Sequence, residues 1–249
     1  MSPGISVVIP FFNEGGNVLP LAREVFAALD GEDFELVMVD DASTDATLAE
    51  MHQARAELGS RVRVVRHRCR AGQSTALVTG VRAARFPWVA SLDGDGQNDP
   101  ADIPRMLARL RGPGLPARVE LVIGDRRAGR RDHWLRRASS RVANAARNAL
   151  LHDGVPDSGC GLKLLHRDAF LALPYFDHMH RFLPVLVRQG GGQVLSVPVN
   201  HRPRLRGQSK YGVANRLFVG VVDLFGVAWL GRRNRRTEWQ VEEPESSPS

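Results

Sequence analysis

Short runs of apolar, often β-branched residues alternate along the chain with stretches that carry apolar residues at helical spacing. The runs predict strands at residues 5–10, 34–39, 62–65, 88–92 and 121–123. Continuous apolar runs of this length are typical of strands buried on both faces of a parallel sheet. The stretches at 17–29, 76–84 and 100–110 carry apolar residues three or four positions apart, which predicts helices.

This alternation of strand and helix predicts an α/β fold with a mostly parallel sheet. Ligands of such sheets bind beyond the carboxyl ends of the strands. Polar residues gather at three of these ends: Asn13 and Glu14, Asp40 and Asp41, and Asp93 and Asp95. We therefore expect the three acidic clusters to face one crevice.

Several common site motifs are absent from these positions. No G-x-G-x-x-G follows the first strand and no G-x-x-x-x-G-K-[ST] occurs, which argues against a dinucleotide site and a P-loop. Asp93-x-Asp95-x-Gln97 begins like an EF-hand loop, but Pro104 stands where the bidentate glutamate is needed. His178 and His180 could ligate a metal, although a hydrogen-bonded or surface histidine pair is the commoner arrangement.

The composition of the 249-residue chain indicates the cellular compartment in which it works. Its two cysteines, Cys69 and Cys160, are too few for a disulfide scaffold or a four-cysteine zinc site, and they fit a reducing compartment. No run of about 20 apolar residues occurs, and the N-terminus lacks the pattern of a signal peptide. We therefore expect a cytoplasmic protein.

Positive charge is concentrated in two segments. The chain has 34 basic and 27 acidic residues, a formal net charge of +7, and only two of the basic residues are lysines. Residues 126–147 hold eight arginines and one aspartate, and residues 202–236 hold eight arginines, one lysine and one aspartate. Such patches indicate an anionic partner, which would be nucleic acid, a phosphate ligand or anionic lipid. The alternative is a set of solvated surface arginines.

Asp93-Gly94-Asp95 gains meaning from four accompanying segments: residues 7–14, residues 39–47, Gly124-Asp125-Arg126, and Arg204-x-x-Gly207-x-Ser209-Lys210. Together they resemble the family 2 glycosyltransferases, and within these the polyprenyl-phosphate glycosyltransferases typified by dolichol-phosphate mannose synthase. The resemblance covers residues 5–231. It implies the GT-A fold, a Rossmann-like nucleotide-diphospho-sugar transferase domain with helices on both faces of the sheet.

The resemblance assigns roles to particular residues. The implied metal positions for Mg²⁺ or Mn²⁺ are Asp93, Asp95 and Gln97. The implied nucleotide-sugar pocket is formed by Pro10, Asn13, Glu14, Asp40, Asp45, Asp93, Arg204 and Lys210. The implied acceptor-phosphate residues are Arg126, Arg136 and Ser140, and the implied catalytic residues are Asp93, Asp95 and Arg126. Glycines 94 and 96 would let the backbone approach a ligand closely. Asp41 and Ser43 either belong to this pocket or cap the second helix.

One stretch departs from the family pattern. Asp157-Ser158-Gly159-Cys160-Gly161 stands at the place of the family's D-x-[ST]-G turn, but Cys160 and Gly161 replace the commoner Phe-Arg. The departure weakens any detailed mapping of acceptor contacts onto this turn. The Q-x-x-R-W motif of processive synthases is absent, which favours transfer of a single sugar.

Residues 213–230 are rich in Val, Leu, Phe and Trp, with Arg216 and Asp223 as the only charges. This stretch is a poor spanning helix and predicts an amphipathic helix on a membrane surface, followed by four arginines within 232–236. A helix packed on the protein's own core is the alternative. The expected organisation is a GT-A catalytic domain at 1–212, a membrane-associating segment at 213–236 and a disordered tail at 237–249. A homo-oligomer or another protein would supply any bilayer-spanning part.

The function that the resemblance implies is a metal-dependent, inverting transfer of one sugar. The donor would be a GDP- or UDP-sugar, and the acceptor would be dolichyl or undecaprenyl phosphate at the cytoplasmic face of the membrane. The expected location is cytoplasmic, with peripheral attachment to the inner face of the cell membrane through anionic lipid. A GT-A enzyme acting on a soluble saccharide or protein is the alternative. Nucleic-acid binding is a distant alternative that no helix-turn-helix, RNP or zinc-finger motif supports.

Overall fold

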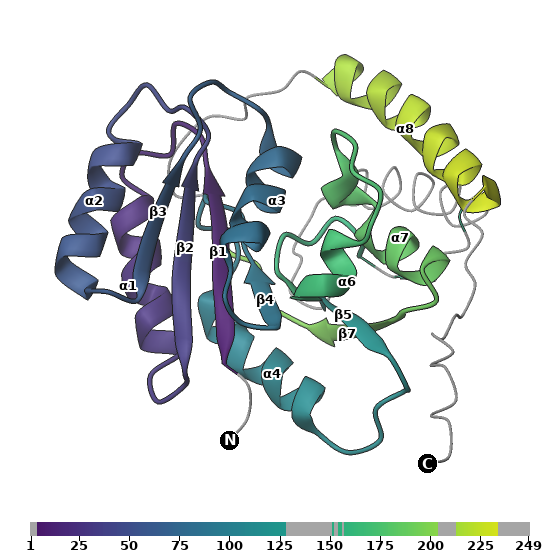
Figure 1. The fold of residues 1–249 in the computed structure, drawn as a ribbon, viewed down its shortest axis with the longest axis horizontal. Helices are drawn as coiled ribbons and strands as arrows, with labels where there is room; N and C mark the ends of the chain where they lie inside the picture. The colour runs from purple at the N-terminus through teal and green to yellow at the C-terminus, as the bar shows by residue number, and fades with distance from the viewer. Residues whose placement is uncertain (1–3, 128–150, 152–153, 156, 204–212, 234–249) are drawn as a thin grey trace, which may run out of the picture.

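The computed structural model describes residues 4–127, 151, 154–155, 157–203 and 213–233. Their elements follow the predicted alternation of strand and helix (Figure 1). In chain order they are β1 (Ile5–Phe11), α1 (Val18–Ala28), β2 (Phe34–Asp40), α2 (Thr47–Leu58), β3 (Val62–Arg66), α3 (Gln73–Ala83), β4 (Trp88–Ser91), η1 (Pro100–Asp102), α4 (Ile103–Arg111), β5 (Val119–Asp125), β6 (Lys163–His166), α6 (Arg167–Leu171), η2 (Met179–Arg181), α7 (Leu183–Gln189), β7 (Gln193–Pro198) and α8 (Val213–Arg233). The five predicted strands and the predicted helices are confirmed.

The strands form one sheet in the order β3-β2-β1-β4-β6-β5-β7. β1 is parallel to β2 and β4, and β5 is parallel to β7, so the sheet is mostly parallel as predicted. β6 is antiparallel to both β4 and β5. As a result, the first residue of β6, Lys163, pairs with Ser91 and Ile123 near the edge where β4 and β5 end.

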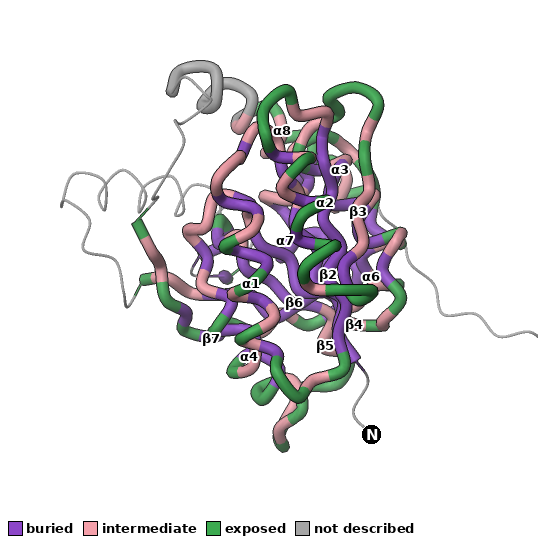
Figure 2. The backbone as a smooth tube through the Cα atoms, turned by 90° about the vertical axis from the view of Figure 1, so that its left-hand side faces the viewer, coloured by how far each residue is buried: buried purple, intermediate pink, exposed green. Residues whose placement is uncertain are grey.

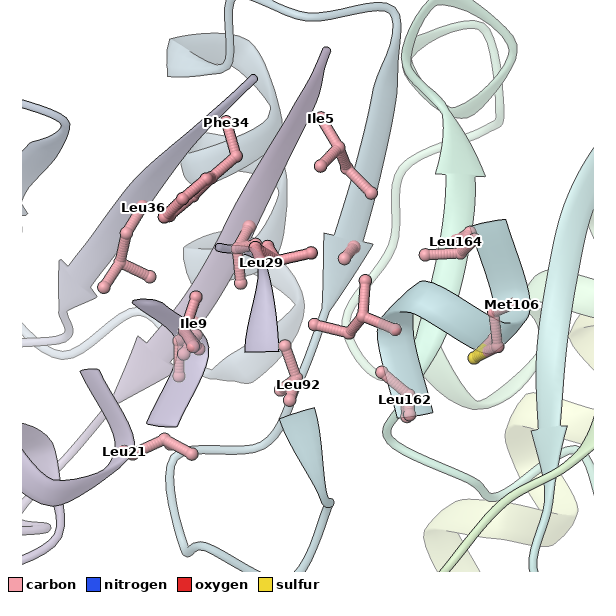
Figure 3. Close-up of a cluster of buried hydrophobic side chains, with 14 of the residues drawn as sticks. Ile5, Ile9, Leu21, Leu29, Phe34, Leu36, Leu92, Met106, Leu162 and Leu164 are labelled. Carbon is pink, nitrogen blue, oxygen red and sulfur yellow. The ribbon is translucent and has the colours of Figure 1, made fainter. Parts of the chain in front are cut away.

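Helices cover both faces of this sheet, and alternate strand residues point into two cores. Ile5, Val7 and Ile9 of β1 pack with residues of α1, α2 and α4 (Figure 3). Val8 points to the other face and packs with residues of α3, α6 and α7. The central strands β1 and β2 are therefore buried along most of their length, whereas the edge strands β3 and β7 and the outer sides of the helices are more exposed (Figure 2).

α8 joins the second core by one side only. Val227 is 1% exposed, and its carbonyl oxygen accepts a hydrogen bond from Gln189 Nε2 of α7 (3.2 Å). Val222, Phe225 and Trp229 are 55%, 63% and 59% exposed. Among the described residues, no helix combines the length and the apolar character that crossing a bilayer requires.

Candidate active site

The loop after β1 is joined to the loop after β2 by hydrogen bonds at the carboxyl edge of the sheet. The backbone N–H of Asn13 donates to Ser43 Oγ (3.0 Å), and the backbone N–H of Glu14 donates to Thr47 Oγ1 (2.8 Å). The following backbone N–H donates to Asp45 Oδ2 (3.0 Å). Three residues of the predicted nucleotide pocket therefore lie in one polar cluster, reached from two consecutive loops.

Asp40 ends β2 with a fully buried carboxylate. Its Oδ1 accepts a hydrogen bond from the backbone N–H of Ser43 (3.0 Å). Its Oδ2 has no hydrogen-bond partner in the part of the chain that the structure describes, and Arg66 Nε lies 3.7 Å from it. A buried carboxylate oxygen without a hydrogen bond costs free energy, and the nearby Arg66 guanidinium offsets part of that cost.

Asp41 and Ser43 have structural contacts, but neither caps α2. The Asp41 carboxylate accepts two backbone N–H groups of the loop before α3, at 2.8 and 2.9 Å. Ser43 Oγ accepts the hydrogen bond from the β1 loop. The start of α2 is held instead by Asp45, whose Oδ1 accepts hydrogen bonds from the backbone N–H and the hydroxyl of Thr47.

These hydrogen bonds control the ionisation of Asp45. Partial burial opposes the charged carboxylate, but the donors from Thr47 and Gly15 outweigh it and lower the pKa of Asp45 below its ordinary value. The carboxylate therefore stays ionised around neutral pH and keeps the two loops together.

Asp93 stands directly beyond β4, at the centre of the edge. Its Oδ1 accepts a hydrogen bond from Gln73 Nε2 at the start of α3 (2.8 Å), and its backbone N–H donates to Asn98 Oδ1 (3.1 Å). A Cβ atom on Gly161 would lie 2.1 Å from Asp93 Oδ2 and 2.6 Å from Asn98 Oδ1. Gly161 is therefore required for Asp93 to occupy this position.

Asp95 and Gln97 form the turn that follows. The backbone N–H of Gln97 donates to Asp95 Oδ1 (3.1 Å), and its carbonyl oxygen accepts from the backbone N–H of Arg202 (3.0 Å). Gly96 has φ +73° and open space where a Cβ would be, which fits the close approach of a ligand. Gly94 differs from the expectation, because its Cβ would lie 2.5 Å from the aromatic ring at the end of β1. Gly94 therefore makes room for the protein's own core.

Lys163 brings a buried cation to the same edge. It is 5% exposed, and its Nζ donates to the carbonyl oxygen of Cys160. Burial raises the pKa of Asp93, and Lys163 opposes that shift more than any other charged neighbour; Asp95 raises the pKa further and Arg126 lowers it. Burial in turn lowers the pKa of Lys163, and Asp93 opposes the change. Each charge therefore offsets part of the effect that burial has on the pKa of the other.

Arg126 follows β5 and is held by Asp157. Arg126 Nε donates to Asp157 Oδ2 (2.8 Å), Nη2 donates to Oδ1 (2.9 Å), and the backbone N–H also donates to Oδ2 (3.2 Å). Burial opposes the guanidinium charge, but Asp157 outweighs it and raises the pKa of Arg126. The nearby thiol of Cys160 has its pKa raised by burial, so it stays neutral and is a poor nucleophile.

Asp93 and Asp95 have the chemistry of a partial site for a divalent cation. They offer hard oxygen donors, and the negative charge of Asp95 disfavours the ionised form of Asp93 in the absence of a cation. Among the residues described, no group of three or more His, Cys, Asp and Glu side chains could hold a metal ion. The pair therefore fits an ion that takes most of its ligands from phosphate oxygens and water, as Mg²⁺ commonly does.

The two histidines have different partners: the ring of His180 is hydrogen-bonded, and the ring of His178 lies beside a carboxylate. His180 Nδ1 lies 2.7 Å from Ser74 Oγ, and burial, aided by Lys163, lowers the pKa of His180 to about 3. His178 Nδ1 lies 3.3 Å from Asp223 Oδ2 of α8. The two rings therefore have separate partners.

Several arginines of the two predicted basic patches already form ion pairs with acidic residues of the same chain. Arg126 pairs with Asp157 and Arg127 with Asp125, whereas Arg202 pairs with Glu24 and Asp99 at 2.6 Å each. Charge counted along the sequence therefore overestimates what these arginines offer to a partner. The other predicted phosphate-binding residues, Arg136, Ser140, Arg204 and Lys210, lie outside the described residues.

Four residues of this site were not predicted from the sequence: Gln73, Asp157, Gly161 and Lys163. Lys163 carried one available signal, because it is one of only two lysines in an arginine-rich chain. Asp157 and Gly161 carried another signal, since they stand at the place of the family's D-x-[ST]-G turn. Gln73 becomes recognisable only when the fold brings it against Asp93.

Comparison with known proteins identifies the family and the fold of the chain. A family model described as "Glycosyl transferase family 2" matches residues 6–173. A dodecaprenyl-phosphate galacturonate synthase of Rhizobium johnstonii is 34% identical over 236 residues, which cover 93% of this chain and 68% of that protein. An undecaprenyl-phosphate 4-deoxy-4-formamido-L-arabinose transferase of Pseudomonas aeruginosa is 36% identical over 223 residues, covering 88% of this chain and 63% of that protein. The chain thus spans about two thirds of the length of these relatives.

Solved structures share the fold. Glucosyl-3-phosphoglycerate synthase from Mycobacterium tuberculosis, in complex with Mn²⁺, UDP and glucosyl-3-phosphoglycerate, has a TM-score of 0.68 at 21% identity, covering 93% of this chain and 80% of that chain. The same enzyme in complex with Mg²⁺ and UDP has a TM-score of 0.66 at 22% identity, covering 93% and 79%. At this level of identity, the likeness shows the shared GT-A architecture.

Proposed function

Because this chain belongs to glycosyl transferase family 2, we propose that it transfers one sugar from a GDP- or UDP-sugar to a polyprenyl phosphate, with inversion at the anomeric carbon. One observation carries the proposal. Asp93 lies at the edge of the sheet between the polar loops that follow β1 and β2 on one flank and the cations Lys163 and Arg126 on the other. The names of the relatives cited above supply the acceptor class, since both are named for transfer to a polyprenyl phosphate.

The flank formed by the loops after β1 and β2 is rich in hydrogen-bond acceptors, which suits the nucleotide of the donor substrate. Ribose hydroxyls and base N–H groups both donate hydrogen bonds, and Asp40 Oδ2 is a buried oxygen with no donor among the described residues. Asn13, Glu14 and Asp45 stand in the adjoining loops, which are fixed to each other before any ligand arrives. A pocket fixed in advance loses little conformational entropy on binding.

The carboxylates beyond β4 suit the diphosphate. Asp93 and Asp95, with Gln97, would hold Mg²⁺ or Mn²⁺, which when bound would neutralise the charge that develops on the leaving diphosphate. Gln73 orients Asp93 through its hydrogen bond, and Gly161 leaves the space that the carboxylate occupies. Arg204 and Lys210 complete this side in the family pattern.

The cationic flank suits the acceptor. A phosphate monoester is an anion at neutral pH, so it can attack the anomeric carbon without a strong general base. Its main requirements are positioning and charge neutralisation beside the donor diphosphate. Arg126 supplies a buried, oriented guanidinium for this task, and Arg136 and Ser140 are the proposed partners.

Transfer to a lipid phosphate is tested directly. The purified protein is incubated with a panel of GDP- and UDP-sugars and undecaprenyl phosphate in detergent, with Mg²⁺ or Mn²⁺, and products are identified by mass spectrometry. We expect a lipid carrying one sugar, and loss of product in excess EDTA. A parallel reaction supplies a soluble saccharide instead of the lipid. Transfer to the saccharide alone would refute a lipid acceptor, and full activity in EDTA would refute the metal requirement.

The exposed side of α8 supports peripheral attachment to the inner face of the membrane. Val222, Phe225 and Trp229 are three and four positions apart, so they lie on one side of the helix, opposite the buried Val227. Arg232 and Arg233 follow, with the Arg233 guanidinium 6.0 Å from the centre of the Trp229 ring. An apolar stripe ending in arginines fits an anionic bilayer.

Vesicle sedimentation tests this attachment. The protein is expected to pellet with anionic vesicles at low salt and to stay in solution with zwitterionic ones. Replacing both Phe225 and Trp229 with Ser should weaken partitioning by about tenfold or more, because burying such side chains is worth more than 1 kcal/mol each. Tyr175→Ser is the matched control, since Tyr175 is 55% exposed but lies outside α8. An unchanged partition coefficient in the double variant would refute the role of α8.

A further inference from the structure

We propose that Asp157 is a positioning residue that aims the Arg126 guanidinium at the acceptor phosphate, and that Gly159 keeps the approach to that guanidinium open. This inference rests on the proposed function and deepens it, since Arg126 is its acceptor-binding group. It concerns the turn at 157–161, where the sequence departs from the common family pattern.

The ion pair between Arg126 and Asp157 fixes both the position and the orientation of the guanidinium. Both carboxylate oxygens are engaged, and Oδ2 also accepts the backbone N–H of Arg126, so rotation about the side-chain bonds is restricted. A guanidinium has five N–H donors, and the ion pair uses two of them. Three N–H donors therefore face away from Asp157 and can serve an anion.

Burial makes this pairing necessary. The Arg126 side chain is 13% exposed, and Asp157 is 8% exposed. Lys163 adds a second buried positive charge, and the charge of Arg126 lowers the pKa of Lys163. Without Asp157, two cations would share a poorly hydrated space. Asp157 therefore keeps Arg126 in place until an anionic acceptor arrives.

Gly159 stands where the guanidinium meets solvent. The residue is exposed, and a Cβ on it would lie 3.6 Å from Arg126 Nη2 and 3.9 Å from Asp157 Oδ1. Both distances are ordinary van der Waals contacts, and the φ of Gly159 lies outside the left-handed region, so the fold tolerates alanine here. As far as the described residues show, the absent side chain leaves Nη2 open to an approaching phosphate oxygen.

The neighbouring pair supplies a matched control. Arg127 and Asp125 also form a two-point ion pair, with Arg127 Nη2 2.8 Å from Asp125 Oδ2. One residue separates Asp125 and Arg127 in the sequence, and the Arg127 side chain is 60% exposed. The same kind of ion pair is therefore present beside the site, with an exposed guanidinium and without a neighbouring Lys163.

The experiment measures steady-state kinetics with undecaprenyl phosphate and donor binding by calorimetry. Asp157→Asn and Gly159→Ala should each raise the KM for lipid phosphate by about tenfold, as expected for one impaired charge-assisted hydrogen bond. The donor Kd should stay within about twofold, and Asp125→Asn should leave all values unchanged. A KM effect without a donor effect separates positioning from a general loss of structure, which would weaken both.

Three outcomes would overturn the inference. These are an unchanged KM in Asp157→Asn and Gly159→Ala, an equal rise in Asp125→Asn, or a parallel loss of donor binding. If the wild-type enzyme itself does not use the lipid, the proposed function fails. Direct binding of farnesyl phosphate by calorimetry then tests the phosphate site, and equal affinity in wild type and in Asp157→Asn would refute it independently.

Discussion

The two flanks of the catalytic edge are built by different means. The donor flank is the side that binds the nucleotide sugar, formed by the loops after β1 and β2. Backbone N–H groups of the first loop donate to side chains of the second, and these two loops follow strands that are consecutive in the sequence and adjacent in the sheet. On the acceptor flank, between β4 and β5, an inserted antiparallel strand brings buried charges together from distant segments. The donor flank therefore tolerates the loss of one contact better than the acceptor flank, where each removed charge leaves another one unpaired.

The largest effect is expected at Gly161, which lies between the flanks. Gly161→Ala places a methyl group within 3 Å of both Asp93 Oδ2 and Asn98 Oδ1, so the Asp93 carboxylate must move. Displacement by about 1 Å should lower kcat by roughly 100-fold, which steady-state kinetics will measure. Gly226→Ala on the exposed side of α8, where a Cβ meets no atom within 4 Å, is the control. Wild-type kcat in Gly161→Ala would show that Asp93 need not occupy its present position.

Asp95→Ala should come next. Removing one of two carboxylates should abolish metal-dependent donor binding and lower kcat by up to about 100-fold, on the scale of losing one electrostatic stabiliser. Calorimetry with the nucleotide sugar, with and without Mn²⁺, separates the two effects. The fold should survive, as checked by circular dichroism, because the Asp95 side chain is only partly buried. Retention of Mn²⁺-dependent binding in this variant would place the metal elsewhere.

Arg126→Ala and Arg127→Ala compare an arginine inside the acceptor flank with an exposed arginine beside it. Losing the buried guanidinium should cost about 1.5–3 kcal/mol, which is roughly 10- to 150-fold in kcat/KM for lipid phosphate. Losing the exposed one should cost less than about 1 kcal/mol. Kinetics at fixed donor concentration measures both. Equal small losses would mean that the arginines only attract anionic lipid, and a loss of donor affinity in Arg126→Ala would assign this residue to the other substrate.

The smallest effect concerns Asp45 on the donor flank and depends on pH. Since its pKa is lowered in the folded protein, ionised Asp45 stabilises the fold above the ordinary value of 3.8 and ceases to do so as pH falls through the folded value. Asp45→Ala should therefore lose about 1 kcal/mol or less at pH 7, as for an exposed helix-start residue. Urea unfolding at pH 7 and at about pH 3 should show the difference shrinking in acid. A difference that grows in acid would contradict this account.

The parallel part of the fold could be predicted from the sequence because its signals are local. Each predicted strand is a short, mostly apolar run, and Asp40 and Asp93 follow such runs directly. β6 could not be predicted, since four residues with Lys163 and His166 at the ends carry no strand period and their direction is set by pairing with β4.

The acceptor flank was harder to predict for a similar reason. Arg126 and Asp157 are 31 positions apart, and Arg202 and Glu24 are 178 positions apart. A count of charges along the chain therefore identifies basic segments but not which arginines are already neutralised. The family resemblance in the sequence pointed to Arg126 as a site residue. Only the structure shows that Asp157 holds the Arg126 side chain.

The alternation of buried charges at this edge has a kinetic consequence. Asp93, Lys163, Arg126 and Asp157 together carry no net charge, so they exert little pull on a distant anion. Encounter with an anionic lipid surface then depends on exposed groups such as Arg232 and Arg233. At physiological ionic strength their attraction is screened over about 8 Å. Added salt should therefore slow the arrival of the enzyme at the bilayer, while turnover of substrate already bound proceeds at an unchanged rate.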